Sequence, residues 1–226
     1  MATSTNSQDS TLVTVDVWSD IACPFCYMGT TALQQAIDQF EHGHSVQVVY
    51  HSFQLNPELP EEYAQSANEF LAHEMRVPVA QAAAMNQELS VRAATLGLKF
   101  QTDSMILTNT RRAHRLIHFA RKHGQQVEMV KRLFRAHYTD SLHIGHYDVL
   151  ADLADKVGLD RQKALATLES DAFEDAVKAD LSHAQKLGIK GVPFILLNGK
   201  YTLTGAQPVG SYLKALQAAW EDRINQ

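Results

Sequence analysis

The chain has 226 residues, of which 45% are hydrophobic and 20% charged, so it is long enough to bury a full core. Its formal net charge of −5 does not indicate a nucleic-acid partner. Residues 1–10 are polar and predicted to be disordered. They lack a basic, apolar signal sequence, and no apolar run reaches membrane-helix length, so we expect a cytoplasmic protein without a membrane partner.

The first predicted strand leads directly into the only two cysteines of the chain. Residues 12–18 alternate and are rich in valine, as expected of a buried strand. Cys23 and Cys26 follow with C-x-x-C spacing, and Pro24 suits the first position of a helix. Unpaired N–H groups and the partial positive charge at a helix start stabilise a thiolate. The pattern therefore predicts a reactive Cys23, with Cys26 one helical turn away and able to attack a disulfide on it.

Two other interpretations of the cysteine pair remain open at this point. The pair could be half of a zinc site, but structural zinc sites usually use two such pairs or a pair plus two histidines, and the chain has no second pair. It could also be a buried, inert pair. Structural disulfides are rare in a reducing cytosol, and a proline between the cysteines favours redox chemistry.

The next segments complete a strand–helix–strand unit. The helix that begins at Pro24 carries Leu33, Ile37 and Phe40 on one face and ends at residues 42–44. Residues 46–53 form the second predicted strand. Because a helix connects the two strands, we expect them to be parallel.

Residues 61–187 contain helical patterns and no convincing strand, after a turn-rich linker at 55–60. The predicted helices cover residues 61–74, 78–97, 108–122, 126–138 and 148–157, followed by two helices capped by Asp160 and Asp171. The basic cluster of Arg111, Arg112 and Arg115 is interpreted as a solvated helix face. His137, His143 and His146 are interpreted as surface or loop histidines, because their spacing is irregular and no carboxylate or thiol completes a ligand pattern with them; no metal site is predicted.

The end of the chain returns to strands. Residues 194–197 and 200–204 flank Asn198-Gly199, a strong hairpin signal, and an amphipathic helix with Val209, Leu213 and Trp220 on its apolar face follows. The order is βαβ, a helical block, then ββα. We therefore predict an α/β protein with a thioredoxin fold and a large all-α insertion between strands 2 and 3. The thioredoxin-like parts are 11–59 and 188–226, and the inserted helical domain is 60–187.

A proline stands directly before the third predicted strand. Pro193 is tolerated there because the first residue of a strand need not donate a hydrogen bond. In the thioredoxin layout this loop lies against the C-x-x-C helix, so Val192 would present its backbone N–H and C=O to a substrate disulfide beside Cys23. The Val192–Pro193 bond could be cis, although an ordinary trans turn is the alternative.

These motifs together resemble the DsbA family of thioredoxin-fold oxidoreductases, in its cytosolic FrnE-like branch, which is related to 2-hydroxychromene-2-carboxylate isomerases and kappa-class glutathione transferases. The matching residues are Asp20, Cys23-Pro24-Phe25-Cys26-Tyr27, Gly29, Phe53, Leu55-Asn56-Pro57, Asn109-Thr110, Ala113-His114, Gly191-Val192-Pro193-Phe194 and Gly205-Ala206-Gln207. The resemblance implies that Cys23 is the nucleophile, Cys26 the resolving thiol and the bond before Pro193 cis. It also implies that Pro24, Phe25, Val192, Asn109 and His114 contact the substrate.

At two positions this chain differs from some of the proteins that it resembles. FrnE-like relatives usually have tryptophan, and periplasmic DsbA enzymes histidine, where this chain has Phe25. Because phenylalanine supplies no donor or positive charge near the thiolate, we expect a less oxidising pair than in the periplasmic enzymes. The isomerases and transferases typically carry serine at the position of Cys23, so an intact Cys23 argues against their chemistry.

The predicted function is a thiol–disulfide oxidoreductase acting on protein or small-molecule disulfides. No cofactor is expected beyond the Cys23–Cys26 disulfide, and glutathione is a candidate co-substrate. We expect a separate thiol system to regenerate the cysteines, and the protein to be a monomer or a homodimer. The alternatives are a glutathione-dependent isomerase or transferase, which would not need Cys26, and a redox-sensing or chaperone-like binding module, which would bind clients without either cysteine.

Overall fold

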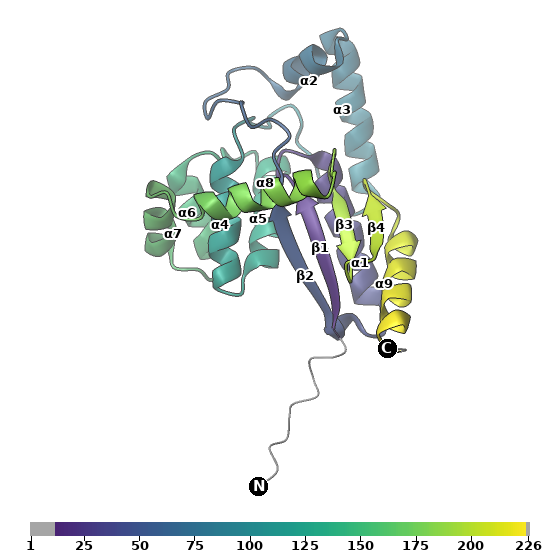
Figure 1. The fold of residues 1–226 in the computed structure, drawn as a ribbon. Coiled ribbons are helices and arrows are strands. Elements are labelled where there is room, and N and C mark those ends of the chain that lie inside the picture. Colours follow the sequence, from purple (N-terminus) through teal and green to yellow (C-terminus); the bar gives the residue numbers. More distant parts are fainter. Residues whose placement is uncertain (1–11, 225–226) are drawn as a thin grey trace.

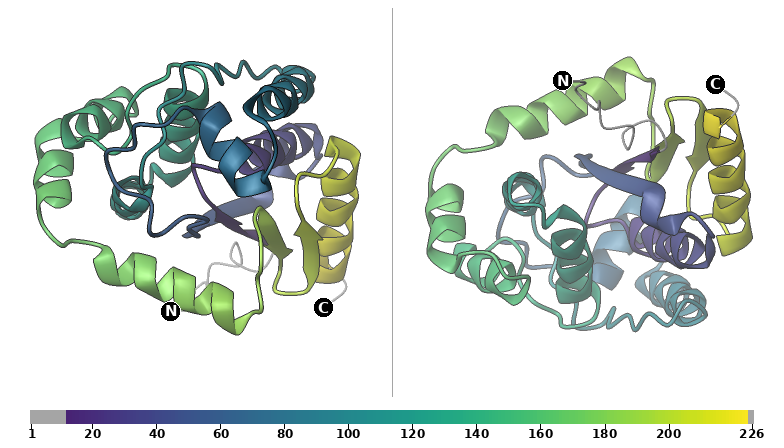
Figure 2. Two further views of the ribbon diagram at one scale, coloured as in Figure 1. Left: turned by 90° about the horizontal axis from the view of Figure 1, so that it is seen from above. Right: turned by 90° about the horizontal axis from the view of Figure 1, so that it is seen from below.

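The structure, a computed structural model, describes residues 12–224 (Figure 1). The prediction of a disordered segment at 1–10 lies outside these residues. Four strands form one sheet, and helices cover both of its faces (Figure 2). None of the helices within residues 12–224 is long and apolar enough to cross a lipid bilayer.

The sheet has the strand order β2-β1-β3-β4. Its strands are β1 (Val13–Ser19), β2 (Val46–Ser52), β3 (Phe194–Leu197) and β4 (Tyr201–Thr204). β1 and β2 are parallel, and β3 is antiparallel to both β1 and β4. With the helix order given below, this arrangement confirms the predicted thioredoxin fold.

The two faces of β1 contact different helices. Val13, Val15 and Val17 are fully buried in the main core, which includes α1 (Pro24–Gln39) and α9 (Val209–Ile224). Trp18 points to the opposite face and packs in a second cluster with residues of α8 (Glu174–Lys186). Burying one such valine contributes about 1.5–3 kcal/mol to folding. The alternation along β1 thus explains why α8 and α1 lie on opposite sides of the sheet (Figure 2).

The segment between β2 and β3 is helical, which confirms the predicted all-α insertion. A single 3-10 turn, Gly43–Ser45, precedes β2. After β2 come α2 (Ala67–Met75), α3 (Val79–Ala94), α4 (Arg111–Lys122), α5 (Gln126–Tyr138), α6 (Tyr147–Lys156), α7 (Arg161–Glu169) and α8. Helices α2 and α3 pack on each other and lie beyond the carboxyl ends of β1 and β2 (Figure 1).

The first helix of this segment starts later than the sequence pattern predicts. We predicted a helix from Glu61, but α2 begins at Ala67. Ser66 accepts a hydrogen bond from the Glu69 backbone N–H, while the Glu69 carboxylate accepts one from the Ser66 N–H. This reciprocal capping box sets the start of the helix. Residues 61–66 are therefore left as an irregular segment.

The predicted hairpin between β3 and β4 is confirmed. Asn198 and Gly199 have φ angles of 49° and 67°, as the tight turn requires. The Asn198 side chain also accepts a hydrogen bond from the Thr14 N–H and donates one to the Ala219 carbonyl, both at 2.9 Å. This turn residue therefore joins β1, the hairpin and α9.

The prediction that the basic cluster is a solvated helix face is wrong. Arg115 is only 4% exposed. Its guanidinium donates to four backbone carbonyls at the end of α7 and just beyond it, those of Thr167, Leu168, Ser170 and Ala172. Arg111 pairs with Glu174, the first residue of α8. The charge of Arg115 is buried because it satisfies carbonyls that a helix end leaves without partners. The sequence pattern of α4 alone does not reveal such long-range partners.

Candidate active site

The two cysteines lie at the junction of β1 and α1. Cys23 is the residue that caps α1, with extended φ and ψ angles of −94° and 111°, and Pro24 occupies the first helical turn. The Cys23 N–H donates to the Asp20 carbonyl at 3.1 Å, which closes the turn after the strand. The Cys23 carbonyl then accepts from the N–H of Cys26 at 3.0 Å and begins the helix. The Cys23 side chain therefore lies at the electropositive start of α1.

The two thiols have opposite acidities. The pKa of Cys23 is lowered, because its sulfur accepts hydrogen bonds from the Cys26 thiol and from the N–H groups of Cys26 and Phe25, and these outweigh its burial. The pKa of Cys26 is raised well above its usual range, because this side chain is fully buried and lies beside the Cys23 sulfur. Cys23 is thus the thiol that ionises first, and Cys26 retains its proton.

The loop before β3 packs against the cysteines. The Val192–Pro193 peptide bond is cis, and the Val192 carbonyl oxygen lies 3.6 Å from the Cys23 sulfur, which donates to it as a thiol. Gly29 of α1 permits this approach: a Cβ atom there would lie 3.0 Å from Cγ of Pro193 and 3.2 Å from the hydroxyl of Tyr212. The structure therefore brings together both sulfurs and the Val192–Pro193 peptide, which are about 170 positions apart in the chain.

A buried carboxylate lies next to this arrangement. Asp20 accepts hydrogen bonds from the Leu55 N–H at 2.8 Å and from Nε2 of His114 at 3.2 Å. Burial acts to raise the pKa of Asp20, but these bonds outweigh it and lower the pKa. The carboxylate is therefore ionised, and its negative charge acts to raise the pKa of Cys23. His114, predicted to contact substrate, is buried against Asp20.

Asn109, the other predicted contact residue from the helical segment, holds a loop. Its side-chain amide donates to the carbonyls of Pro57 and Leu59 at 2.9 and 2.7 Å, and its oxygen accepts from Gln54. The loop that it holds, residues 54–59, contributes Leu55 to the cavity described next. Asn109 thus positions part of the cavity wall and does not line the cavity itself.

A cavity of about 300 Å³ opens beside Cys23. Pro24 and Phe25, both predicted to contact substrate, line it, and α2 and α3 form its far wall. Its other lining residues are Ala22, Leu55, Asn56, Leu59, Ala67, Phe70, Leu71, Asn86, Leu89, Thr102, Met105, Leu107, Thr108, His137 and Tyr138. The lining is mainly apolar, as in small-molecule binding sites.

Two polar residues of this cavity were missed by the sequence reasoning. His137 was expected near the surface, but it is buried, and neither of its ring nitrogens has a hydrogen-bond partner among the described residues. Burial lowers the pKa of His137 to about 4, so the imidazole is neutral at pH 7. The Tyr138 hydroxyl also has no partner there. The sequence places His137 in a helix but does not show which face of that helix is buried. The packing of α5 against α1 in the structure shows this.

Residues 14–217 match the family described as DSBA-like thioredoxin domain. A probable DsbA oxidoreductase from Streptomyces coelicolor is 34% identical in sequence; the match covers 92% of this chain and 90% of that structure, with a TM-score of 0.87. The uncharacterized protein YwbO of Bacillus subtilis (strain 168) is 28% identical over 205 residues, 90% of this chain and 96% of that protein. The cytosolic disulfide reductase DsbM from Pseudomonas aeruginosa, solved with glutathione, is 18% identical over 94% of this chain and 100% of its own, with a TM-score of 0.60, and shares the fold.

Proposed function

This chain belongs to the family of DSBA-like thioredoxin domains, and from that premise we propose that it is a thiol–disulfide oxidoreductase that cycles a Cys23–Cys26 disulfide. The observation that carries the proposal is the opposite acidity of two adjacent thiols at the start of α1. A nucleophile needs its thiolate form, whereas a resolving thiol must stay protonated until an intermediate has formed.

The reaction begins with the Cys23 thiolate attacking one sulfur of a substrate disulfide. A bond forms between Cys23 and that sulfur, the substrate S–S bond breaks, and the second substrate sulfur leaves with the electron pair and takes up a proton. Cys26 then loses its proton and attacks the Cys23 sulfur. This forms the Cys23–Cys26 disulfide and releases the first substrate sulfur as a thiolate. The substrate gains two electrons, the protein loses two, and the same steps in reverse oxidise a dithiol.

Burial is the largest cause of the raised pKa of Cys26 and persists through the reaction, but two further contributions come from the Cys23 sulfur and exist only in the reduced state. In the mixed disulfide, Cys23 carries no negative charge, and it no longer accepts the hydrogen bond that keeps the proton on Cys26. Both contributions raise the pKa of Cys26 in the reduced protein. Their loss lowers that pKa at the step where Cys26 must act as a nucleophile. The backbone carbonyl and N–H of Val192, a half-buried residue, would hold the substrate sulfur beside Cys23 during this exchange.

The cavity supports a small disulfide as the preferred substrate class. Cys23 is only 3% exposed, and α2 and α3 close the space beside it to about 300 Å³. A substrate with an apolar group next to its disulfide would fill this space. Asn56, Asn86 and His137 are available to bind the polar atoms of that substrate. We propose glutathione as the reductant that regenerates the thiols, in the cytoplasm, where reduced glutathione is abundant.

The test supplies reduced glutathione as the reductant and compares the reduction of bis(2-hydroxyethyl) disulfide and of insulin by the wild-type chain, Cys23→Ser and Cys26→Ser. We expect catalysis by the wild-type chain, the uncatalysed rate for Cys23→Ser, and an accumulating mixed disulfide on Cys23 in Cys26→Ser, seen by mass spectrometry. Catalysis by Cys23→Ser would reject the proposal. Full turnover by Cys26→Ser would instead support a glutathione-dependent isomerase or transferase.

A further inference from the structure

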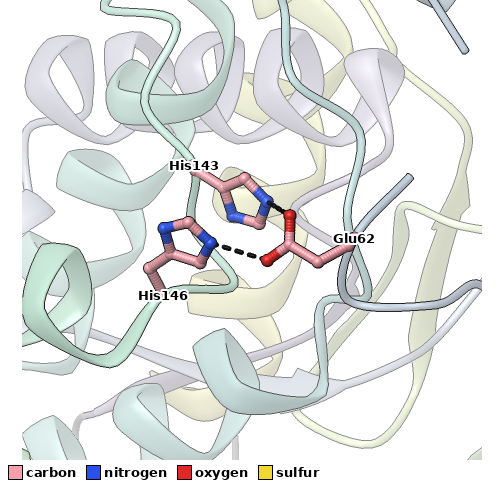
Figure 3. A group of neighbouring side chains, drawn as sticks. All are labelled: Glu62, His143 and His146. Atoms are coloured by element: carbon pink, nitrogen blue, oxygen red, sulfur yellow. Dashed lines mark hydrogen bonds and ion pairs between the residues drawn. The ribbon is translucent and has the colours of Figure 1, made fainter. Parts of the chain in front are cut away.

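Two histidines and one glutamate meet at a place in the fold that the thiol chemistry does not use (Figure 3). His143 and His146 belong to the loop between α5 and α6, and Glu62 belongs to the irregular segment before α2. Nε2 of His146 lies 2.7 Å from one oxygen of Glu62, and Nε2 of His143 lies 3.5 Å from the other. The two imidazole rings are stacked, with centroids 3.7 Å apart.

We propose that Glu62, His143 and His146 bind a divalent transition-metal ion of the Zn²⁺ type. One ligand atom from each of the three side chains lies within 4.8 Å of the other two. Two imidazoles and one carboxylate are a common ligand set for zinc, with the fourth position left to water. In a tetrahedral site the ligand atoms stand about 3.3 Å apart. Glu62, whose side chain is 76% exposed, has the freedom to move back from the two Nε2 atoms and make room for an ion beside them.

The backbone around the two histidines is held in place by contacts outside the site. The Gly145 N–H donates to Nδ1 of His143 at 3.3 Å, so the Nε2 atom of this ring faces Glu62. The Gly145 carbonyl accepts from Arg112 at 2.7 Å. Glycine is required here, because a Cβ atom would lie 2.2 Å from Oγ1 of Thr108. The contacts that Gly145 makes with Arg112 and Thr108 fix the loop that carries both histidines before an ion arrives.

The segment that carries Glu62 is also held in place by a contact outside the site. The Thr108 hydroxyl that touches Gly145 donates to the Glu61 carbonyl at 2.8 Å, directly before Glu62. To admit an ion, the Glu62 side chain moves back and the stacked rings turn, so that both Nε2 lone pairs point to the ion. Binding at Nε2 of His143 places the remaining ring proton on Nδ1 and gives up the bond from Gly145, which at 3.3 Å is a weak one.

An ion at this place would join two segments that are far apart in sequence. His146 and Glu62 are separated by 84 positions. The segment with Glu62 continues from the loop that supplies Leu55, Asn56 and Leu59 to the cavity beside Cys23. Metal binding would therefore stabilise one wall of that cavity against α5 and α6. The binding itself does not depend on the proposed redox function.

The experiment is a titration of the full chain with Zn²⁺ in competition with a chromophoric chelator. The protein is first oxidised so that Cys23 and Cys26 form a disulfide and offer no thiolate. We expect one equivalent to bind, and at least 10-fold weaker binding in both Glu62→Gln and His146→Ala. These side chains are exposed or half-exposed, so both variants should fold, which circular dichroism checks.

The matched control is His73→Ala, which removes a histidine that is 82% exposed and lies beside Glu74. This variant should bind Zn²⁺ as the wild-type chain does. The proposal is overturned if the oxidised wild-type chain binds no Zn²⁺. It is equally overturned if Glu62→Gln and His146→Ala bind as tightly as His73→Ala. Both results would leave the thiol-exchange assay unaffected, so the two proposals fail separately.

Discussion

The carboxylate of Asp20 lies 3.2 Å from Nε2 of His114, and neither side chain is more than 2% exposed. The pair joins the end of β1 to α4 directly beside the two thiols. Asp20 also accepts the Leu55 N–H, so the same carboxylate holds the loop after β2. Its charge has a chemical effect as well, because a negative group near Cys23 disfavours the thiolate.

Removing this charge should make Cys23 more acidic. In Asp20→Asn the side chain keeps its shape and one hydrogen-bonding oxygen but loses the negative charge. We expect the thiolate absorbance near 240 nm of the reduced protein to appear at lower pH than in the wild-type chain. Asp171→Asn, which neutralises an exposed carboxylate elsewhere, should leave the titration unchanged. A shift of the Asp20→Asn curve to higher pH would contradict the assigned role of this charge.

The close contact between Gly29 and Pro193 predicts a second effect. In Gly29→Ala the new methyl group would meet Cγ of Pro193 and the Tyr212 hydroxyl at 3.0–3.2 Å, so the loop with Val192 must shift. Overpacking of this kind costs about 1–3 kcal/mol, and we expect that loss in urea unfolding together with slower disulfide exchange. Gly210→Ala in α9 adds a methyl group with nothing within 4 Å and should be neutral or stabilising. Equal stability of the two variants would argue against the contact.

A buried charge network predicts how stability depends on pH. His51 lies between Asp16 and Asp180, at 2.8 and 3.0 Å. Burial acts to lower the pKa of His51, but the bonds to both carboxylates outweigh it and raise the pKa to about 9 from 6.5. A raised pKa adds stability that is complete below 6.5 and is lost as the pH rises through 9. The shift corresponds to roughly 3 kcal/mol at most.

The measurement is urea unfolding of the wild-type chain and His51→Gln between pH 6 and pH 10. The stability difference between them should be largest at pH 6 and should shrink steadily up to pH 10. A difference that is constant over this range would show that the histidine is not charged in the folded protein. At the acid end, the lowered pKa of Asp180 means that its contribution is lost only as the pH falls below about 4.

The buried guanidinium of Arg115 should be costly to remove. Arg115→Ala leaves four carbonyls around the end of α7 without their donor and breaks the ion pair with Glu174. Unsatisfied buried groups cost about 1–3 kcal/mol each, so we expect a loss of at least about 3 kcal/mol in unfolding free energy. Arg121→Ala removes an exposed arginine of the same helix and should change stability by less than about 0.5 kcal/mol.

Local patterns were sufficient to predict most of the fold. Valine alternation in β1, Pro24 at a helix start and Asn198-Gly199 between two short apolar runs are all determined by neighbouring residues, and each corresponds to an observed element. The predicted start at Glu61 is too early, because the capping box of Ser66 and Glu69 sets the start of α2 at Ala67.

The site was less predictable, because its contacts cross long distances in the sequence. The C-x-x-C spacing identified Cys23 and Cys26, and Pro193 was recognised from its place before a strand. Asp20 was noted only as part of a resemblance. The burial of His137, and the approach of Glu62 to His146 from 84 positions away, depend on how the helices pack and have no local signature.

The most direct test of the central claim measures the reactivity of each cysteine separately. The reduced wild-type chain is treated with iodoacetamide for a short time at a series of pH values, and each cysteine peptide is quantified by mass spectrometry. The account predicts that Cys23 is alkylated first, with a midpoint below that of an ordinary thiol, while Cys26 stays unmodified across the same range. Equal alkylation of both cysteines, or earlier alkylation of Cys26, would contradict it.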